Sequence, residues 1–244
     1  LGIEYIKALR RLSSAMTPYT IRRLGAGHDE ERPVGDVASA SYIRRLYRAG
    51  RVIDAAAYQP RGVCPVVDEA LRAGRCPAEE ERLERAVLAR LRTLTAQELA
   101  ALPGVSEGLE NRLYEGVRRA GSLPQLYGLI KTKRYPLTRL RRLVWSAFLG
   151  VPAGWERQAP PYIRVLGAGP GGREILTAAK QARRERGGLP PLVSRAAQFE
   201  QLDDRCRALF ALECRATDLY ALSLPTPPPC GVECTTGMIK QGWD

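Results

Sequence analysis

Beyond residue 51 the sequence repeatedly ends one amphipathic helix and starts another, and this pattern constrains the fold more than any other feature. The stretch that begins at Glu79 has acidic residues first and arginines last, the order that a helix dipole favours. Thr95 and Glu98 then have the spacing of a capping box, and a Pro-Gly pair ends the short helix that they open. We therefore expect a mostly helical region here.

Three more helices are expected before residue 150. Ser106 and Ser122 are candidate starts of the first two, which run to about Ala120 and Lys131, and Thr138 is the expected cap of the third. The apolar residues of the third follow a helical period: Leu140, Leu143, Val144, Ala147 and Phe148. We expect that stripe to face a core.

The first 50 residues predict a different local pattern. Residues 2–15 are expected to form a helix, residues 19–23 a short strand, residues 25–36 a glycine- and acid-rich loop, and Ser39 or Ser41 the cap of a helix that ends at Gly50. This order is typical of one βα edge of an α/β sheet.

A second α/β pattern follows residue 155. Residues 162–166 predict a strand, 173–186 a helix, the region of Leu192 a short strand and 199–221 a last helix, before an irregular proline-rich tail. The expected fold is mainly α with minor β (α+β). The expected divisions are 1–50, a helical region over 51–155, and a small βαβ element with a C-terminal helix over 156–244.

The composition favours an anionic partner in the cytoplasm. Lys and Arg number 38 against 26 Asp and Glu, a formal net charge of +12, which suits nucleic acid, although solvated arginine faces are the simpler alternative. No apolar run approaches the roughly 20 residues that span a bilayer, so no membrane association is expected. The six cysteines form no CxxC pair and His28 is the only histidine, so we expect reduced thiols and no metal site.

The densest positive charge lies between Lys131 and Arg142. Six cations and no acid occur in these twelve residues, and Tyr135 and Trp145 provide aromatic rings nearby. Cations bind phosphates and rings stack on unpaired bases, so we predict RNA contact. The predicted contact residues are Lys131, Lys133, Arg134, Tyr135, Arg139, Arg141 and Arg142. The alternative is a solvated helix face.

Two other motifs allow more than one interpretation. Residues 99–113 (LAALPGVSEGLENRL) resemble a helix-hairpin-helix, whose turn presents amides to phosphate, but a plain antiparallel helix pair explains them equally well. Gly167, Gly169 and Gly172 match the GxGxxG dinucleotide pattern, yet no acid follows the next strand and the other strands of a doubly wound sheet are missing.

The segment ASASYIR, residues 38–44, combines a serine-rich helix start with an arginine one turn later. Helix amides and hydroxyls can bind phosphate oxygens while Arg44 supplies a charged fork. An ordinary helix cap is the alternative.

Taken in order, six blocks resemble one known family, the bacterial tRNA(Met) cytidine acetate ligases, which are nucleotidyltransferase-like. The blocks are LGIEYIKAL, PYTIRRLGAG, ASASYIR, EGLENRL, KTKRYPLTRLRR and PYIRVLG, and they span residues 1 to about 176. A looser match continues to residues 219–225.

The resemblance implies an ATP-dependent RNA-modifying ligase. Such an enzyme activates acetate as acetyl-adenylate and transfers the acetyl group to the wobble cytidine of elongator tRNA(Met), giving N4-acetylcytidine. ATP is implied as a substrate with Mg²⁺ expected beside it, and the helical region is expected to bind the anticodon arm.

The same resemblance assigns residues of the first segment to ATP. Ser39, Ser41 and Arg44 match the family's phosphate-binding motif, and Arg23 matches an ATP-binding arginine. The family's strand and HxGH turn are expected to precede Leu1, so this chain alone is expected to be inactive, and no general base is assigned. The loop around His28 is shorter than the family pattern implies.

Two other functions remain open from the sequence. One is a non-catalytic RNA-binding module of helix-hairpin-helix type, which residues 99–113 favour. The other is a dinucleotide-dependent oxidoreductase built on the GxGxxG pattern.

Overall fold

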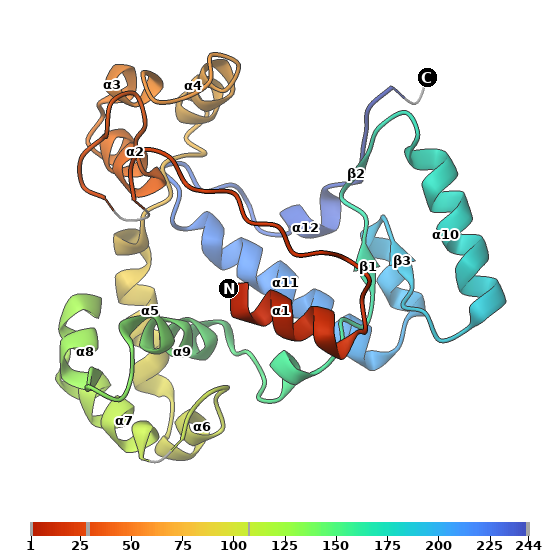
Figure 1. Ribbon diagram of the computed structural model, residues 1–244. Helices are drawn as coiled ribbons and strands as arrows, with labels where there is room; N and C mark the ends of the chain where they lie inside the picture. The colour runs from red at the N-terminus through yellow and green to blue at the C-terminus, as the bar shows by residue number, and fades with distance from the viewer. Residues whose placement is uncertain (1, 28–29, 107, 243–244) are drawn as a thin grey trace. The chain divides into compact units, whose positions relative to one another are not determined.

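The computed structural model describes residues 2–27, 30–106 and 108–242 (Figure 1). The chain divides into two compact units, Leu1–Ala70 and Leu71–Asp244. Each unit has its own local packing.

The first unit contains short helices joined by irregular segments. They are α1 (Gly2–Arg11), α2 (Ala40–Arg48), α3 (Val52–Ala56) and α4 (Cys64–Arg72), within whose last turn the boundary falls. Helices α2 and α3 pack together, with Leu46 and Ala55 buried. Tyr42 and Tyr58 add an edge-to-face contact with ring centroids 5.8 Å apart. Helix α1 buries no residue.

The strand predicted over residues 19–23 is wrong. This segment is irregular, and the side chains of Tyr19 and Ile21 are 89% and 88% exposed. A strand is stabilised by ladder hydrogen bonds to a neighbour, and none of the described residues pairs with this segment. The predicted βα sheet edge is therefore not formed in this unit, and its helix α2 stands without a strand.

The helical region of the second unit has a continuous apolar core. Its elements are η1 (Glu80–Leu83), α5 (Glu84–Thr93), α6 (Ala96–Ala100), α7 (Leu109–Arg119), α8 (Leu123–Ile130) and α9 (Leu137–Leu149). The predicted stripe of α9 is buried in full: Leu140, Leu143, Val144, Ala147 and Phe148. The predicted capping box of Thr95 and Glu98 is present, and Ser122 caps α8. These helix predictions are confirmed.

Two helix starts differ from the sequence prediction. Helix α7 begins at Leu109 rather than Ser106, after Gly108 turns the chain with a positive φ of 80°. Helix α9 begins at Leu137, because the Pro136 carbonyl accepts the amides of Arg139 and Leu140, so Thr138 lies inside the helix. Both differences come from backbone geometry, which at Gly108 starts the helix after the expected cap and at Pro136 starts it before the expected cap.

The rest of the second unit is a small α/β element. Its parts are η2 (Trp155–Arg157), β1 (Ile163–Arg164), β2 (Gly167–Ala168), α10 (Gly172–Arg186), β3 (Leu192–Val193), η3 (Ala196–Gln201), α11 (Asp204–Ala221), α12 (Val232–Thr235) and β4 (Ile239–Lys240). Strands β1 and β3 are parallel and joined through α10, so the predicted βαβ element is confirmed (Figure 1). The tail is less irregular than predicted, since β4 pairs with β2.

Aromatic packing and ion pairs hold this element together. Phe199 stacks on Phe210 with ring centroids 3.9 Å apart, and Tyr162 meets Phe199 edge-on. The Arg164 guanidinium lies 3.2 Å from Glu213 and 2.5 Å from Glu233. A hydrogen bond from Thr217, together with Arg164, lowers the pKa of Glu233. The turn of α12 is thereby fixed to α11 and β1.

The contact between α7 and α8 predicts opposite effects for two glycines. A Cβ at Gly116 would lie 2.8 Å from Cγ2 of the fully buried Ile130, whereas a Cβ at Gly128 would meet no atom within 4 Å. We expect Gly128→Ala to stabilise the fold through helix propensity, and Gly116→Ala to lose that gain to overpacking. The two variants should differ by about 1–3 kcal/mol in urea unfolding followed by circular dichroism. Equal midpoints would contradict this packing.

Candidate functional site

Ser39 lies at the centre of the first candidate site. It is fully buried and is the N-cap of α2, where its hydroxyl accepts the amide of Tyr42 at 3.0 Å and donates to the carbonyl of Glu30 at 2.8 Å. One of the two caps predicted from the sequence is thus confirmed. The serine fixes the loop of residues 25–36 to the start of α2.

Arg23 holds the other end of this loop. Its guanidinium donates to the carbonyl of Ala26 at 2.8 Å and to that of Gly27 at 3.4 Å. Gly25 has a φ of +75°, and a Cβ there would lie 2.5 Å from Cβ of Val37, so this turn requires glycine. The loop is held by side chains because it has almost no backbone ladder of its own.

Glu30 completes a continuous series of hydrogen bonds. Its carboxylate accepts the amide of Gly27, while its carbonyl accepts the hydroxyl of Ser39. The structure therefore connects Arg23 to the start of α2 through the loop. The expectation about His28 lies outside the described residues.

Ser41 and Arg44 lie on the exposed side of α2, in its first turn and a half. No acidic residue occurs in the first turn, so the helix dipole is not opposed there. Amides at the start of a helix together with an arginine can bind an anion. Four predicted residues thus belong to one local arrangement, in which Arg23 and Ser39 hold the backbone and Ser41 and Arg44 face solvent.

Sequence reasoning missed two residues of this arrangement. One is Glu30, whose acidic side chain is not expected in a phosphate-binding loop. Nothing in the sequence indicates that it holds the loop through hydrogen bonds. Arg45 donates to the carbonyl of Glu31 at 2.5 Å and lies 5.3 Å from the ring centroid of Tyr42. The one sequence signal for Arg45 was its position next to Arg44. Neighbouring residues of a helix point in different directions, so one arginine can contact the loop while the other faces solvent.

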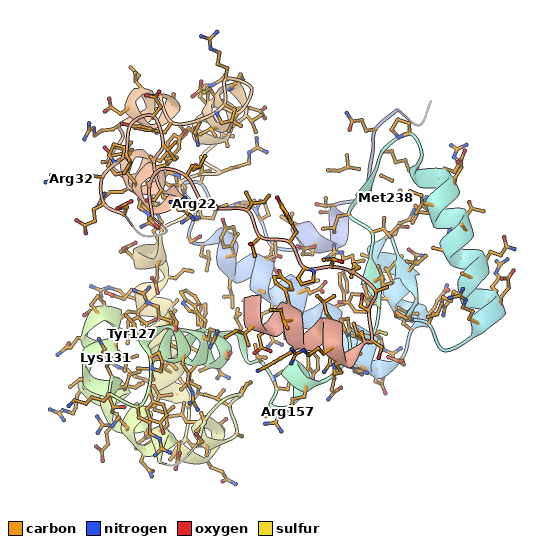
Figure 2. All side chains as sticks on the ribbon, viewed as in Figure 1. Arg22, Arg32, Tyr127, Lys131, Arg157 and Met238 are labelled. Carbon is orange, nitrogen blue, oxygen red and sulfur yellow. The ribbon has the colours of Figure 1, made fainter. Side chains whose placement is uncertain are left out.

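The second candidate site is the basic segment of residues 131–142. Five of its cations are exposed: Lys131, Lys133, Arg134, Arg141 and Arg142. They come from the end of α8, the connecting turn and α9, where Figure 2 labels Lys131. The positive charge of this segment is therefore spread over the end of α8, the turn that follows and the first half of α9.

Tyr135 and Arg139 have internal contacts instead. Tyr135 is only 6% exposed, and its hydroxyl donates to the carbonyl of Ser106. The ring therefore has no open face on which a base could stack. Arg139 donates to the Gly104 carbonyl at 2.7 Å and to the Ser106 hydroxyl, which ties α9 to the turn after α6.

A pocket of about 390 Å³ lies beside this basic segment, between η1, α8 and α9. Tyr127 and Lys131, both labelled in Figure 2, line it together with Glu80 and Arg141. Burial, with a further contribution from Glu80, raises the pKa of Tyr127 to about 12. The phenol is therefore neutral at physiological pH.

The glycine-rich turn does not form a dinucleotide site. The strands of the described residues make two separate two-stranded sheets, β1 with β3 and β2 with β4, rather than one doubly wound sheet. Gly167 belongs to β2 and pairs with Ile239 of the tail. The turn serves to connect a short strand to α10.

The described residues contain neither a metal-ligand cluster nor a membrane-spanning helix. No group of three or more His, Cys, Asp or Glu side chains there could hold a metal ion. Likewise, none of the helices described is both long and apolar enough to cross a membrane.

Comparison with known proteins identifies the class. A model of the HIGH Nucleotidyl Transferase family matches residues 1–230, so the chain belongs to this family.

The curated relatives narrow this class to one kind of enzyme. The tRNA(Met) cytidine acetate ligase of Acetivibrio thermocellus is 31% identical over 251 residues, covering 98% of this chain and 59% of the relative. That of Syntrophotalea carbinolica is 35% identical over 240 residues, covering 92% and 55%. The chain therefore spans a little over half the length of the curated relatives it matches, and the resemblance expected from the six blocks is confirmed.

Solved structures agree in fold. Thermotoga maritima TmcAL in its apo form I superposes with a TM-score of 0.86 at 26% identity, covering 99% of this chain and 59% of that one. The same protein bound with alpha-thio ATP gives a TM-score of 0.82 at 24% identity, covering 98% and 58%. The short helices and strands described above thus form a known fold.

The buried Ser39 and the exposed Ser41 at the start of α2 should contribute differently to the stability of the fold. Ser39→Ala removes a helix cap and leaves the Glu30 carbonyl unpaired, which should cost about 1–3 kcal/mol. Ser41→Ala leaves both hydrogen bonds of the Ser39 hydroxyl in place and should cost clearly less stability than Ser39→Ala. Amide hydrogen exchange in α2 measures this, with the faster exchange expected in Ser39→Ala. Similar exchange in both variants would remove the structural role of Ser39.

Proposed function

We propose that this chain is part of a tRNA(Met) cytidine acetate ligase. The enzyme would use ATP to activate acetate as acetyl-adenylate and would then acetylate the wobble cytidine of elongator tRNA(Met). The observation that carries this proposal is the hydrogen-bonded series from Arg23 through Glu30 to Ser39, in a chain whose family model covers residues 1–230. This series fixes the loop at the start of α2, the end of the helix that we propose to bind phosphate.

In the proposed enzyme the start of α2 faces the phosphates of ATP. The amides of Ala40 and Ser41 are the first two of the helix, and Arg44 adds a positive charge on the exposed side. Ser39 acts as a positioning residue, because its hydroxyl already donates to the Glu30 carbonyl and accepts the Tyr42 amide. Arg23 shapes the glycine loop, with its guanidinium bonded to two loop carbonyls.

The chemistry requires dense positive charge. An acetate oxygen attacks the α-phosphorus of ATP, and pyrophosphate leaves. The exocyclic amine of cytidine then attacks the acetyl carbon, AMP leaves and the amine loses a proton. Donors fixed before the reaction stabilise the charge that develops on phosphate. We propose that Mg²⁺ enters with the triphosphate as the counterion of its oxygens.

The helical region is proposed to bind the anticodon arm of the tRNA. Exposed cations at residues 131, 133, 134, 141 and 142 supply phosphate contacts from two helices and a turn. Tyr135 is not part of this surface because its ring is buried. Arg139 is not part of it either, because its guanidinium donates to the Gly104 carbonyl and so holds α9 in place.

We further propose that the three sequence divisions have separate tasks. Residues 1–50 belong to the nucleotidyltransferase domain, 51–155 bind tRNA, and 156–244 form an accessory α/β element. On its own, the chain is expected to bind tRNA in a salt-dependent way and to form no adenylate. The reaction is placed in the cytoplasm, where tRNA and ATP occur together.

In the complete ligase, Arg44→Gln should reduce adenylate formation. Loss of one fixed donor to a phosphate that gains charge should cost about 100-fold in rate, while the dissociation constant for tRNA should change by less than about twofold. ATP–pyrophosphate exchange and a tRNA filter-binding assay measure the two quantities.

Arg61→Gln is the matched control, because Arg61 is an exposed arginine of the same unit outside α2. It should change neither quantity. Equal losses of adenylate formation and tRNA affinity in Arg44→Gln would contradict the division of tasks.

Replacing Lys131, Lys133 and Arg134 by Ala should weaken tRNA binding and flatten its salt dependence. Each lost phosphate contact lowers the slope of log K against log salt by about 1. Fluorescence anisotropy of labelled tRNA between 50 and 200 mM KCl, roughly the range in which such contacts are resolved, measures the slope.

The control removes the same number of charges from α1, at Lys7, Arg10 and Arg11. A slope that is unchanged in the first variant, or lowered equally in both, would exclude residues 131–134 as a specific phosphate contact.

A further inference from the structure

A basic pocket lies in the α/β element and is formed by residues outside both candidate sites. It has a volume of about 610 Å³ and is lined by α10, by the link after β3 and by the segment from α12 to β4. Met238, labelled in Figure 2, belongs to this last side. All three sides belong to the second unit.

The lining is strongly positive. Arg173 and Lys180 come from α10, Arg195 from the link after β3, and Lys240 from β4. Among the described residues that line the pocket there is no Asp or Glu. The carboxylate of Glu233, a sequence neighbour, is already held by Thr217 and Arg164. A pocket whose described lining contains cations from three segments and no acidic residue attracts an anion.

The backbone places these cations together. Residues 173, 177 and 180 follow one face of α10, and Ser194 and Arg195 come directly after the carboxyl end of the parallel strand β3. Ligands of parallel α/β arrangements bind at this end of the strands. The amides of Ser194 and Arg195 both donate to Oε1 of Gln198, which keeps the link in a tight turn.

The chemistry of the lining selects phosphate rather than a base or sugar. The described lining contains no aromatic ring on which a base could stack, and no carboxylate that could accept ribose hydroxyls. The glycines of the GxGxxG turn do not line the pocket either. What is present is guanidinium, ammonium and hydroxyl groups, the donors that bind phosphate oxygens.

We propose that this pocket is a phosphate-binding site. The phosphate can come from an RNA backbone or from a small phosphorylated molecule, since both offer the same oxygens. The RNA source rests on the proposed function, whereas the phosphate site does not.

The test uses the chain with Lys180→Gln and Arg195→Gln together. Inorganic phosphate, titrated at constant ionic strength, should shift the amide NMR signals of Thr236 and Gly237 in the parent chain, with saturation at millimolar concentration. The double variant should bind at least tenfold more weakly. Arg184→Gln is the control, because Arg184 is an exposed arginine of α10 that does not line the pocket.

A second arm identifies the source of the phosphate. If it is RNA, the double variant should lower the salt slope of tRNA binding by about 1–2, and Arg184→Gln should not. If it is a small molecule, phosphate binding should be lost in the double variant while tRNA binding is unchanged.

Either of these results supports the phosphate site and assigns its source. No saturable phosphate shift, together with tRNA binding equal in the parent chain, the double variant and the control, would overturn it. Failure of the ligase proposal would appear separately, as unchanged adenylate formation in Arg44→Gln of the complete enzyme. Matching circular dichroism melts confirm that the double variant is folded.

Discussion

The buried hydroxyl of Ser39 is the interaction on which the first candidate site depends. Among the described residues of the loop before α2, regular backbone pairing is limited to one isolated bridge between Val34 and Val37, which cannot hold the loop. A hydroxyl that donates to the Glu30 carbonyl and accepts the Tyr42 amide fixes loop and helix together. Because a buried hydroxyl without a partner is costly, this geometry is set before any ligand arrives. Exposed groups on α2 can then meet an anion at little further entropic cost.

The arginines of this chain divide into two kinds, and net charge alone does not separate them. Some donate to backbone carbonyls: Arg92 to Ala120, Arg112 to Leu129 and Arg139 to Gly104. Guanidinium suits this role because its fork of donors can satisfy carbonyls that the ends of short helices leave open. A hydrogen bond to a carbonyl leaves the positive charge in place, so the net charge of +12 does not separate the two kinds, and the grouping of the cations matters more than their number.

The sequence predicted what is local and failed where pairing is distant. The stripe of α9, the capping box at Thr95 and the cap at Ser39 were correct because each depends on residues within one or two turns. The strand expected at residues 19–23 was wrong because a strand needs a partner, and strand β4 was missed because two residues carry no periodicity. Tyr135 and Lys131 lie in one basic segment, yet one is buried and the other exposed, because Pro136 interrupts the helical period that would separate inside from outside.

The glycine pattern at residues 167–172 shows how a motif can mark a region without supplying its chemistry. A dinucleotide site needs the turn amides to face the pyrophosphate and a carboxylate to meet the ribose. Here Gly167 pairs with Ile239 of the tail, and the nearby pocket is lined by cations of α10, β4 and the link after β3. A parallel strand pair joined by a helix places its carboxyl ends at one side whatever the turn contains. Side chains at that side, rather than the glycines, therefore decide which anion the element can bind.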